Sequence, residues 1–209
     1  MTHRVCLFLK DQRAATAAEF GMVLPLALIF MLGMIDVGRF MWTVNRAEKA
    51  TQMGTRFAVV TTPVPSGLVG YNFAPTIAVG ETIPESAYGT MSCGVLPPPV
   101  VEETCSCAAG GATCPWGTAK TPGQFNLVYG RMKAMLPELE RQHVKIDYAP
   151  SGLGYAGDPT GPDIYPVVTI RIQDFKFQPI TTLLFGLNTP MPTVAYSLTM
   201  EDGIGAASN

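Results

Sequence analysis

The sequence predicts an α+β protein: a long N-terminal membrane-spanning helix, then a small antiparallel sheet domain with one further helix and a disulfide-stapled loop region. Three observations support this fold class. An apolar run lies near the N-terminus, 17 of the 18 prolines follow it, and three segments of the C-terminal half alternate as strands do. We therefore expect a basic leader at 1–14, a long helix at 15–62 and an α+β domain at 63–209.

The apolar run Phe20–Ile35 contains no charged residue and is predicted to cross a membrane. We place the span at about 20–42, which gives 23 residues and roughly 34 Å of helix. Asp36 and Arg39 share a helix face near the far interface, where they can neutralise each other. Pro25 removes a helical hydrogen bond and predicts a kink. A cleaved signal and a buried soluble helix fit less well, because the run is long and apolar on every face.

The helix is expected to continue to about Val60, since the next proline is Pro63. Ala50, Gly54 and Ala58 recur four residues apart, so small side chains form a row along this half of the helix. Such rows let neighbouring backbones approach closely. Two uses of this row remain open from the sequence: packing on the chain's own domain, or packing between neighbouring subunits.

The remaining elements are predicted from their periodicity. Residues 63–124 are rich in Pro and Gly and show no long periodic segment, whereas Gln124–Gln142 has apolar residues at helical spacing. Three segments alternate as strands do, and they are Val144–Tyr148, Tyr165–Phe177 (with Val168, Ile170 and Ile172 on one face) and Pro192–Met200. We expect them to form an antiparallel sheet on which the outer half of the long helix lies.

Charge and cysteine content bear on location and partners. Residues 1–60 carry seven Lys/Arg and four acids, whereas residues 61–209 carry seven Lys/Arg and twelve acids, so the charge distribution does not support a basic nucleic-acid-binding surface on the larger part. Basic residues flank the apolar run on both sides, so the positive-inside rule does not decide the orientation. Four cysteines of the Pro/Gly-rich stretch are disulfide candidates, namely Cys93, Cys105, Cys107 and Cys114.

The spacing of these cysteines favours two disulfides over a zinc site or free thiols, because C-x₂₋₄-C pairs and a nearby His are missing. A bridge between Cys105 and Cys107 would be strained. The pairings left open are Cys93–Cys105 with Cys107–Cys114, and Cys93–Cys107 with Cys105–Cys114. Disulfides need an oxidising compartment, which predicts an extracytoplasmic domain and a cytoplasmic N-terminus.

Catalytic signals are weak, so we expect no enzyme, cofactor, metal or small-molecule substrate. Gly152–Gly157 matches G-x-G-x-x-G, but prolines follow it where a dinucleotide site needs a helix, so a turn is predicted. Asp158 and Asp163 could contact calcium, although a solvated loop fits better. His143 is expected to be an exposed cap at a helix end. A nucleophile elbow, an HExxH motif and a Walker loop are all missing.

One constellation precedes the apolar run: a short basic leader, small residues, and Glu19 followed by an aromatic residue. Two roles of Glu19 remain open: its negative charge favours the N-terminal end of a helix, or its carboxylate pairs with a partner at the membrane edge, where an unpaired charge is costly. Together with residues 17–26, 33–39 and 45–58, this pattern resembles the TadE/TadG-like family of pseudopilins of the tight-adherence (Flp-type) pilus system, over about 45 residues. The resemblance implies a structural minor pilin or pseudopilin that takes part in assembly of a type IVc (Flp) pilus and in surface attachment.

The resemblance also implies processing and partners. A prepilin peptidase would cut between Ala14 and Ala15, where the family usually has Gly before the cut, and would leave Glu19 as the fifth residue. Glu19 would then pair with the new α-amine of a neighbouring subunit, so that two buried charges satisfy each other. The expected partners are membrane lipid, other pilin-like subunits and the peptidase, at a bacterial inner membrane with the C-terminal domain periplasmic or extracellular. The alternative is an uncleaved membrane-anchored envelope scaffold or adhesion protein without pilus incorporation.

Overall fold

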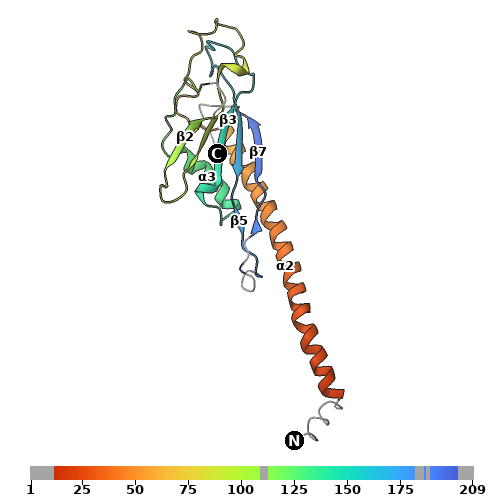
Figure 1. Cartoon of the computed structure of the whole chain (residues 1–209). Helices are drawn as coiled ribbons and strands as arrows, with labels where there is room; N and C mark the ends of the chain where they lie inside the picture. The colour runs from red at the N-terminus through yellow and green to blue at the C-terminus, as the bar shows by residue number, and fades with distance from the viewer. Residues whose placement is uncertain (1–11, 109–112, 182–185, 187–188, 202–209) are drawn as a thin grey trace. The chain divides into compact units, whose positions relative to one another are not determined.

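A computed structural model describes residues 12–108, 113–181, 186 and 189–201 (Figure 1). It confirms the α+β class, with a long apolar helix, an antiparallel sheet, a second α-helix and two disulfides. Most of the predicted leader lies outside the described residues. The chain divides into two compact units, one formed by Met1–Trp42 with Lys176–Thr189 and the other by Thr43–Phe175 with Pro190–Asn209.

Helix α2 spans Gln12–Val59 and contributes its first part to one unit and its last part to the other. Pro25 lies inside it without interrupting the helical residues. Two threonines at the end of the helix donate their hydroxyls to helix carbonyls: Thr55, inside α2, to that of Thr51, and Thr61, just after it, to that of Phe57. The helix then ends before Pro63, which cannot continue it.

The sheet has five strands in the order β2-β1-β3-β4-β7, and every neighbouring pair is antiparallel. Strands β3 (Val144–Ala149), β4 (Val167–Ile172) and β7 (Val194–Thr199) lie within or close to the predicted segments. Strands β1 (Met91–Val95) and β2 (Glu103–Cys107) were not predicted. Their sequences, MSCGV and ETCSC, are short and contain Gly, Ser and Cys, so they lack the apolar alternation that marks a strand.

The predicted strand Tyr165–Phe177 is wrong as a single element. After β4 the backbone turns at Asp174, whose φ is 55°, and a new strand β5 (Lys176–Phe177) pairs with β6 (Thr189–Pro190) in a separate two-stranded sheet. Asp is one of the few residues other than Gly that adopt this left-handed conformation readily. The strand therefore breaks where the sequence pattern continues.

The second helix is shorter than predicted. α3 covers Gln124–Met135, and Leu136 leaves the helix with φ −129° because the residue before a proline avoids helical geometry. The predicted C-terminal part instead holds the short 3₁₀ helix η2 (Arg141–His143), and a second short 3₁₀ helix, η1, covers Glu85–Ala87.

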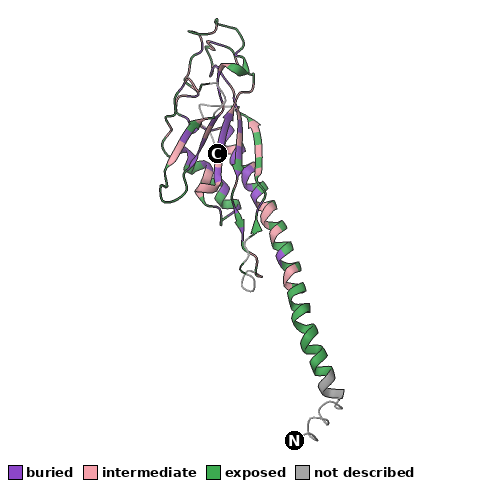
Figure 2. Ribbon diagram, viewed as in Figure 1, coloured by how far each residue is buried: buried purple, intermediate pink, exposed green. Residues whose placement is uncertain are grey.

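The core of the larger unit lies between one face of the sheet and the two helices. Val168, Ile170 and Ile172 of β4 point to this face and are buried, as predicted. From α3, Phe125, Val128 and Met132 are also buried. The outer half of α2 packs here through small side chains, and Figure 2 shows its change from exposed to buried along the helix.

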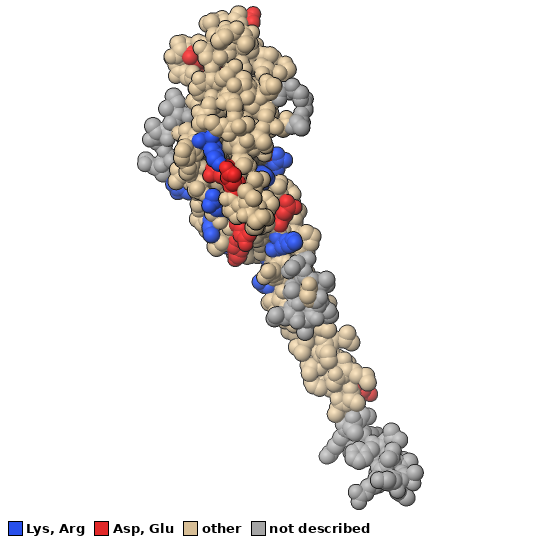
Figure 3. All heavy atoms as spheres, turned by 60° about the vertical axis from the view of Figure 1, so that its left-hand side comes forward, with Lys and Arg blue, Asp and Glu red and all other residues tan. Residues whose placement is uncertain are grey.

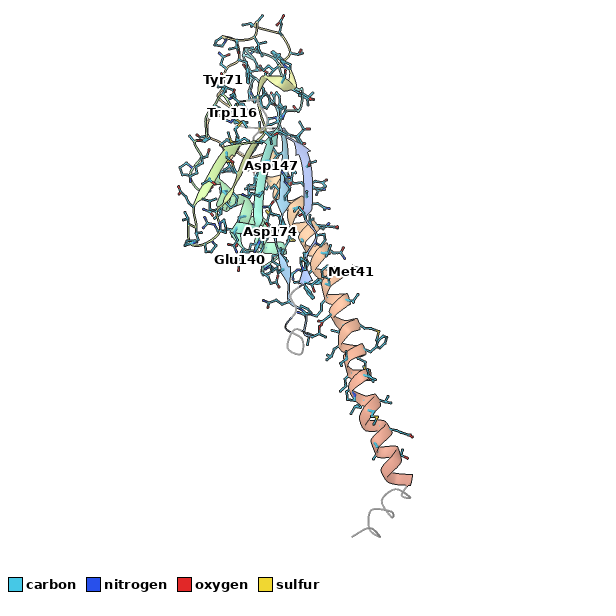
Figure 4. All side chains as sticks on the ribbon, in the orientation of Figure 1. Met41, Tyr71, Trp116, Glu140, Asp147 and Asp174 are labelled. Carbon is cyan, nitrogen blue, oxygen red and sulfur yellow. A yellow bond between two sulfur atoms is a disulfide. The ribbon has the colours of Figure 1, made fainter. Side chains whose placement is uncertain are left out.

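The Pro/Gly-rich stretch has a small core of its own, which the sequence analysis did not foresee. Four aromatic rings form a closed cycle of contacts with centroids 4.8–6.3 Å apart, and they are those of Tyr71, Phe73, Tyr88 and Trp116. Figure 4 labels Tyr71 and Trp116. Edge-to-face contacts of this kind add to the free energy of simple burial. Burial also raises the pKa of Tyr88 to about 12.

Candidate functional site

The first part of α2 exposes its apolar side chains instead of burying them. All residues from 16 to 31 are exposed, and Phe20, Met22 and Phe30 are 64–75% exposed. Within the described residues, one helix (Thr16–Val59) is long and apolar enough to span a membrane, and only 6% of its most apolar stretch is buried. Figure 3 shows this part of the helix almost free of charged atoms. An apolar surface of this extent needs lipid or protein to cover it.

The N-terminal end of this surface carries the predicted processing residues. Glu19 is exposed on α2, three residues after Thr16 and directly before the apolar run. Ala14 and Ala15 also lie within α2, and residues 1–11, which precede the helix, are outside the described part of the chain. The pairing of Glu19 with an amine and the cut at Ala14 therefore stay predictions.

At the other end of the apolar run, the carboxylate of Asp36 is buried and hydrogen-bonded. Its Oδ1 accepts the backbone N–H of Ile180 at 2.7 Å, and its Oδ2 accepts the backbone N–H and the hydroxyl of Thr181 at 2.9 Å and 2.8 Å. Arg39 Nη1 lies 3.3 Å from Oδ1, as the predicted ion pair requires. A carboxylate with this many donors is stable as an anion away from water. We call this arrangement the Asp36 clamp.

The aromatic residue Phe177 completes the clamp. Its ring meets that of Phe40 edge-on with centroids 5.6 Å apart, and the guanidinium carbon of Arg39 lies 5.4 Å from the Phe177 centroid. Arg39 is thus held between a carboxylate and a ring face, which favours a cation on both sides. Sequence reasoning found Asp36 and Arg39 but missed their partners on β5 and after it. Ile180 and Thr181 lie 144 and 145 positions after Asp36, and such distant residues leave no signal in the local pattern.

The small-residue row on α2 packs within the chain's own larger unit. Ala50, Gly54 and Ala58 are all buried. A Cβ built on Gly54 would lie 2.6 Å from Met132 Cγ and 3.2 Å from Ile170 Cδ1, so α3 and the sheet approach the helix as closely as glycine permits. Of the two uses left open, this geometry supports packing on the own domain, and this face of α2 is not free to contact another subunit.

The disulfides select one of the two predicted pairings. Cys93 is bonded to Cys105, which ties β1 to β2, and Cys107 is bonded to Cys114, which ties β2 to the following loop. The bridges therefore stabilise a sheet edge as well as a loop. In the described part of the chain, no group of three or more His, Cys, Asp or Glu side chains is arranged to hold a metal ion.

The glycine-rich segment forms a structural loop, and one expectation about it needs correction. Asp163 is not solvated but buried, and its carboxylate accepts the backbone N–H groups of Phe73 (2.7 Å), Gly157 (3.1 Å) and Asp158 (3.1 Å). Gly152, Gly154 and Gly157 all have positive φ, as the predicted turn requires. The carboxylate thus organises the turn from inside.

Asp158 acts at the surface of the same loop. Its Oδ1 accepts the N–H of Thr160 at 2.8 Å, and this bond is the main reason that its pKa is lowered. The negative charge of Asp158 in turn raises the pKa of Tyr155. These contacts stabilise a turn and do not place a nucleophile beside a base.

His143 is likewise not the exposed cap that we expected. Its side chain is 17% exposed, its Nδ1 lies 3.1 Å from the carbonyl oxygen of Gln173, and its ring meets Phe175 edge-on at 5.6 Å. These contacts hold η2 against the segment that follows β4. His143 therefore has a packing role in this structure.

The face of the sheet opposite the helices carries a row of polar residues in register. Ser106, Ser92, Asp147, Thr169 and Ser197 are paired across all five strands. Asp147, labelled in Figure 4, is buried and forms an ion pair with Arg171 of the adjacent strand. The hydroxyls of Thr169 and Ser197 lie 2.8 Å apart. Most side chains of this row thus bond to residues of neighbouring strands. The alternation of the strand sequences could have revealed the polar row.

A shallow groove lies between α2 and the free edge of β7, lined by residues that include Val44, Glu48, Thr51 and Tyr196. The hydroxyl of Thr55 donates to the carbonyl of Tyr196 at 3.1 Å and so fixes this edge strand to the helix. The groove brings together one carboxylate, small polar groups and apolar side chains, but no nucleophile with an adjacent base.

Fold and site together define a class of protein: an α+β domain carried on a helix suited to membrane anchoring. Residues 14–56 match the model of the family described as TadE-like protein, so the N-terminal segment of this chain is similar to that family, as the sequence resemblance predicted. The matched residues include Glu19, the apolar surface and the Asp36–Arg39 pair. Searches of curated proteins and of solved structures returned no match.

Proposed function

We propose that this chain is a minor-pilin-like or pseudopilin subunit that takes part in assembly of a tight-adherence (type IVc, Flp) pilus and in surface attachment. The observation that carries this proposal is the TadE-like match over 14–56, which associates the chain with a Tad pilus. The matched segment contains the exposed apolar part of α2, whose surface requires a lipid or protein partner. A domain held on such a helix suits a structural subunit and supports a non-enzymatic role.

The proposed topology is a single pass through the bacterial inner membrane, with a cytoplasmic N-terminus and the larger unit periplasmic or extracellular. The two disulfides support this orientation, because they persist in oxidising compartments and both lie in the larger unit. A prepilin peptidase would then reach the bond between Ala14 and Ala15 from the cytoplasmic side. Other pilin-like subunits would cover the helix after its extraction from lipid.

The second candidate is an uncleaved membrane-anchored scaffold or adhesion protein with the same topology. One observation favours it: Ala14 stands before the proposed cut, where the resembling family usually has Gly. This candidate differs from the first in keeping its leader and in staying in the membrane.

Intact mass spectrometry of the unreduced protein from the membrane fraction separates the two candidates. Loss of residues 1–14 with four cysteines oxidised is expected for the subunit. Retention of the full chain would reject processing and favour the anchored scaffold. Recovery from the soluble fraction with all thiols reduced would contradict both.

Substitution of Glu19 tests assembly directly. We expect Glu19→Gln to insert into the membrane normally and to fail in pilus assembly, because the amide cannot neutralise the α-amine of a neighbouring subunit. Glu48→Gln is the matched control, since Glu48 is another exposed glutamate of α2 inside the family match. The measurement is the amount of chain in sheared surface filaments compared with the amount in membranes. Equal incorporation of both variants would reject the pairing.

A further inference from the structure

The segment that the Asp36 clamp holds against α2 has an unusual charge distribution. From Phe177 to Met200 the sequence contains no charged residue. The described beginning of this segment and the lysine before it, residues 176–181, belong to the same compact unit as the apolar part of α2. We refer to residues 176–181 as the β5 arm.

The clamp removes the main obstacle to placing this backbone beside lipid. Irregular backbone is tolerated at membrane depth only where its N–H groups have protein partners, and a lone carboxylate there is also costly. The carboxylate of Asp36 accepts the N–H groups of Ile180 and Thr181, so each side of the contact satisfies the other. Arg39 supplies the compensating positive charge. The carboxylate, the two backbone N–H groups and the guanidinium thus satisfy one another without water as a partner.

The position of the clamp along α2 matches the edge of a bilayer. Asp36 directly follows Ile35, the last residue of the charge-free run. Beyond it, Arg39 is 48% exposed at its side chain, Lys176 is exposed, and Trp42 is 67% exposed. Exposed Lys, Arg and Trp are the residues that anchor a protein at the phosphate and carbonyl layer of a membrane.

Three residues of the β5 arm are exposed, and Ile180 is the apolar one beside the polar Lys176 and Gln178. Ile180 is 38% exposed although its backbone is fixed by Asp36, while Phe177 is buried against Phe40 and Arg39. The side chain of Ile180 therefore contacts the medium that surrounds α2 at the position of Asp36. Charge complementarity favours phospholipid as that surrounding, since exposed cations flank an apolar patch.

We propose that the β5 arm is a second membrane contact of this protein. Ile180 enters the interfacial layer of the bilayer beside α2, the Asp36 clamp holds the arm in place, and Arg39 and Lys176 contact lipid phosphates. The hydrocarbon boundary then lies at about Asp36 instead of at Trp42, where the sequence alone placed the end of the span, and the arm fixes the depth of the helix. This proposal requires membrane insertion but does not depend on leader cleavage or on incorporation into a pilus.

Site-directed spin labelling of the full chain tests the proposal. A nitroxide is attached to Ile180→Cys in a Cys6→Ser background and the protein is reconstituted in liposomes of phosphatidylethanolamine and phosphatidylglycerol. Accessibility to oxygen, which concentrates in lipid, is compared with accessibility to a water-soluble nickel chelate. Leu26→Cys serves as the lipid reference, and Leu153→Cys, exposed in the glycine-rich loop of the other unit, serves as the water reference.

We expect the oxygen-to-nickel ratio at Ile180 to be several-fold higher than at Leu153 and to approach that at Leu26. A ratio equal to that at Leu153 would overturn the proposal. Shielding from both reagents would also overturn it, since a protein partner would then cover the arm.

Adding Asp36→Asn tests the clamp separately. Loss of the carboxylate weakens two backbone hydrogen bonds, so the ratio at Ile180 is expected to fall toward that at Leu153 while the ratio at Leu26 stays unchanged. An unchanged ratio at Ile180 would show that the clamp does not position the arm. The intact mass of each variant, with four cysteines oxidised, verifies that the larger unit has folded.

Discussion

Replacement of Gly54 by alanine measures how closely α2 approaches the rest of the larger unit. The added Cβ would meet Met132 Cγ at 2.6 Å, Met132 Sδ at 3.0 Å and Ile170 Cδ1 at 3.2 Å. Both neighbours are buried, so neither can move into solvent. Overpacking of this kind costs about 1–3 kcal/mol, whereas Gly→Ala inside a helix gains about 0.5–1 kcal/mol.

The expected net effect of Gly54→Ala is a loss of about 1 kcal/mol in the free energy of unfolding. Gly130→Ala is the matched control, because Gly130 is also helical but a Cβ there meets nothing within 4 Å. We expect this control to gain about 0.5–1 kcal/mol. For a domain of this size the two midpoints of thermal unfolding should move in opposite directions, by about 2–4 °C per kcal/mol.

The measurement is thermal or guanidinium unfolding of the full chain in detergent, followed by circular dichroism with the disulfides intact. Detergent micelles cover the apolar part of α2 equally in all variants, so the comparison isolates the larger unit. If Gly54→Ala stabilised the protein as much as Gly130→Ala does, the close packing of α2 on α3 and the sheet would be refuted. The small-residue row would then be available for contacts between subunits.

Three further predictions concern the larger unit. Replacing both Cys93 and Cys105 by alanine removes a disulfide between cysteines 12 residues apart in the sequence. We expect the free energy of unfolding, measured in guanidinium, to fall by about 3 kcal/mol. An unchanged midpoint of unfolding would contradict a stabilising role of this disulfide. Tyr148→Phe leaves the N–H of Val64 without its partner at 3.0 Å, which should lower stability by about 1–3 kcal/mol in the same assay, and no change would mean that water replaces the hydroxyl. The pKa of Asp158 is lowered in the folded protein, so the ionised carboxylate adds to the free energy of unfolding above the unfolded pKa of about 3.9, and this contribution is lost as the pH falls through the folded pKa. Asp158→Asn should therefore flatten the dependence of the free energy of unfolding on pH below about pH 4. An unaltered pH dependence would show that this carboxylate does not contribute.

The Asp36 clamp changes the interpretation of the charged residues at the end of the apolar run. Asp36 and Arg39 were expected to neutralise each other, and they do lie 3.3 Å apart. The carboxylate nevertheless makes its shorter contacts with Ile180 and Thr181. The carboxylate of Asp36 is therefore satisfied within its own chain by more partners than Arg39 alone.

Much of the sheet could be predicted from local patterns, and the failures have physical causes. β3 and β4 alternate clearly and hold β-branched residues at buried positions, while β7 alternates between half-buried and exposed residues, so all three strands are visible in the sequence. β1 and β2 hold together by mutual pairing and by the Cys93–Cys105 bond, neither of which requires local apolar alternation. The break at Asp174 depends on one backbone angle, which a period-two pattern does not encode.

The sequence alone determined the features that depend on composition and short spacing. These are the apolar helix, the Asp36–Arg39 pair, the oxidised cysteines and the TadE-like segment, since each lies within one stretch of chain. The tertiary structure decided which partners these residues meet: Met132 and Ile170 for Gly54, Ile180 and Thr181 for Asp36, and one disulfide pairing of two. Such contacts join residues far apart along the chain, and only the folded backbone fixes their distances.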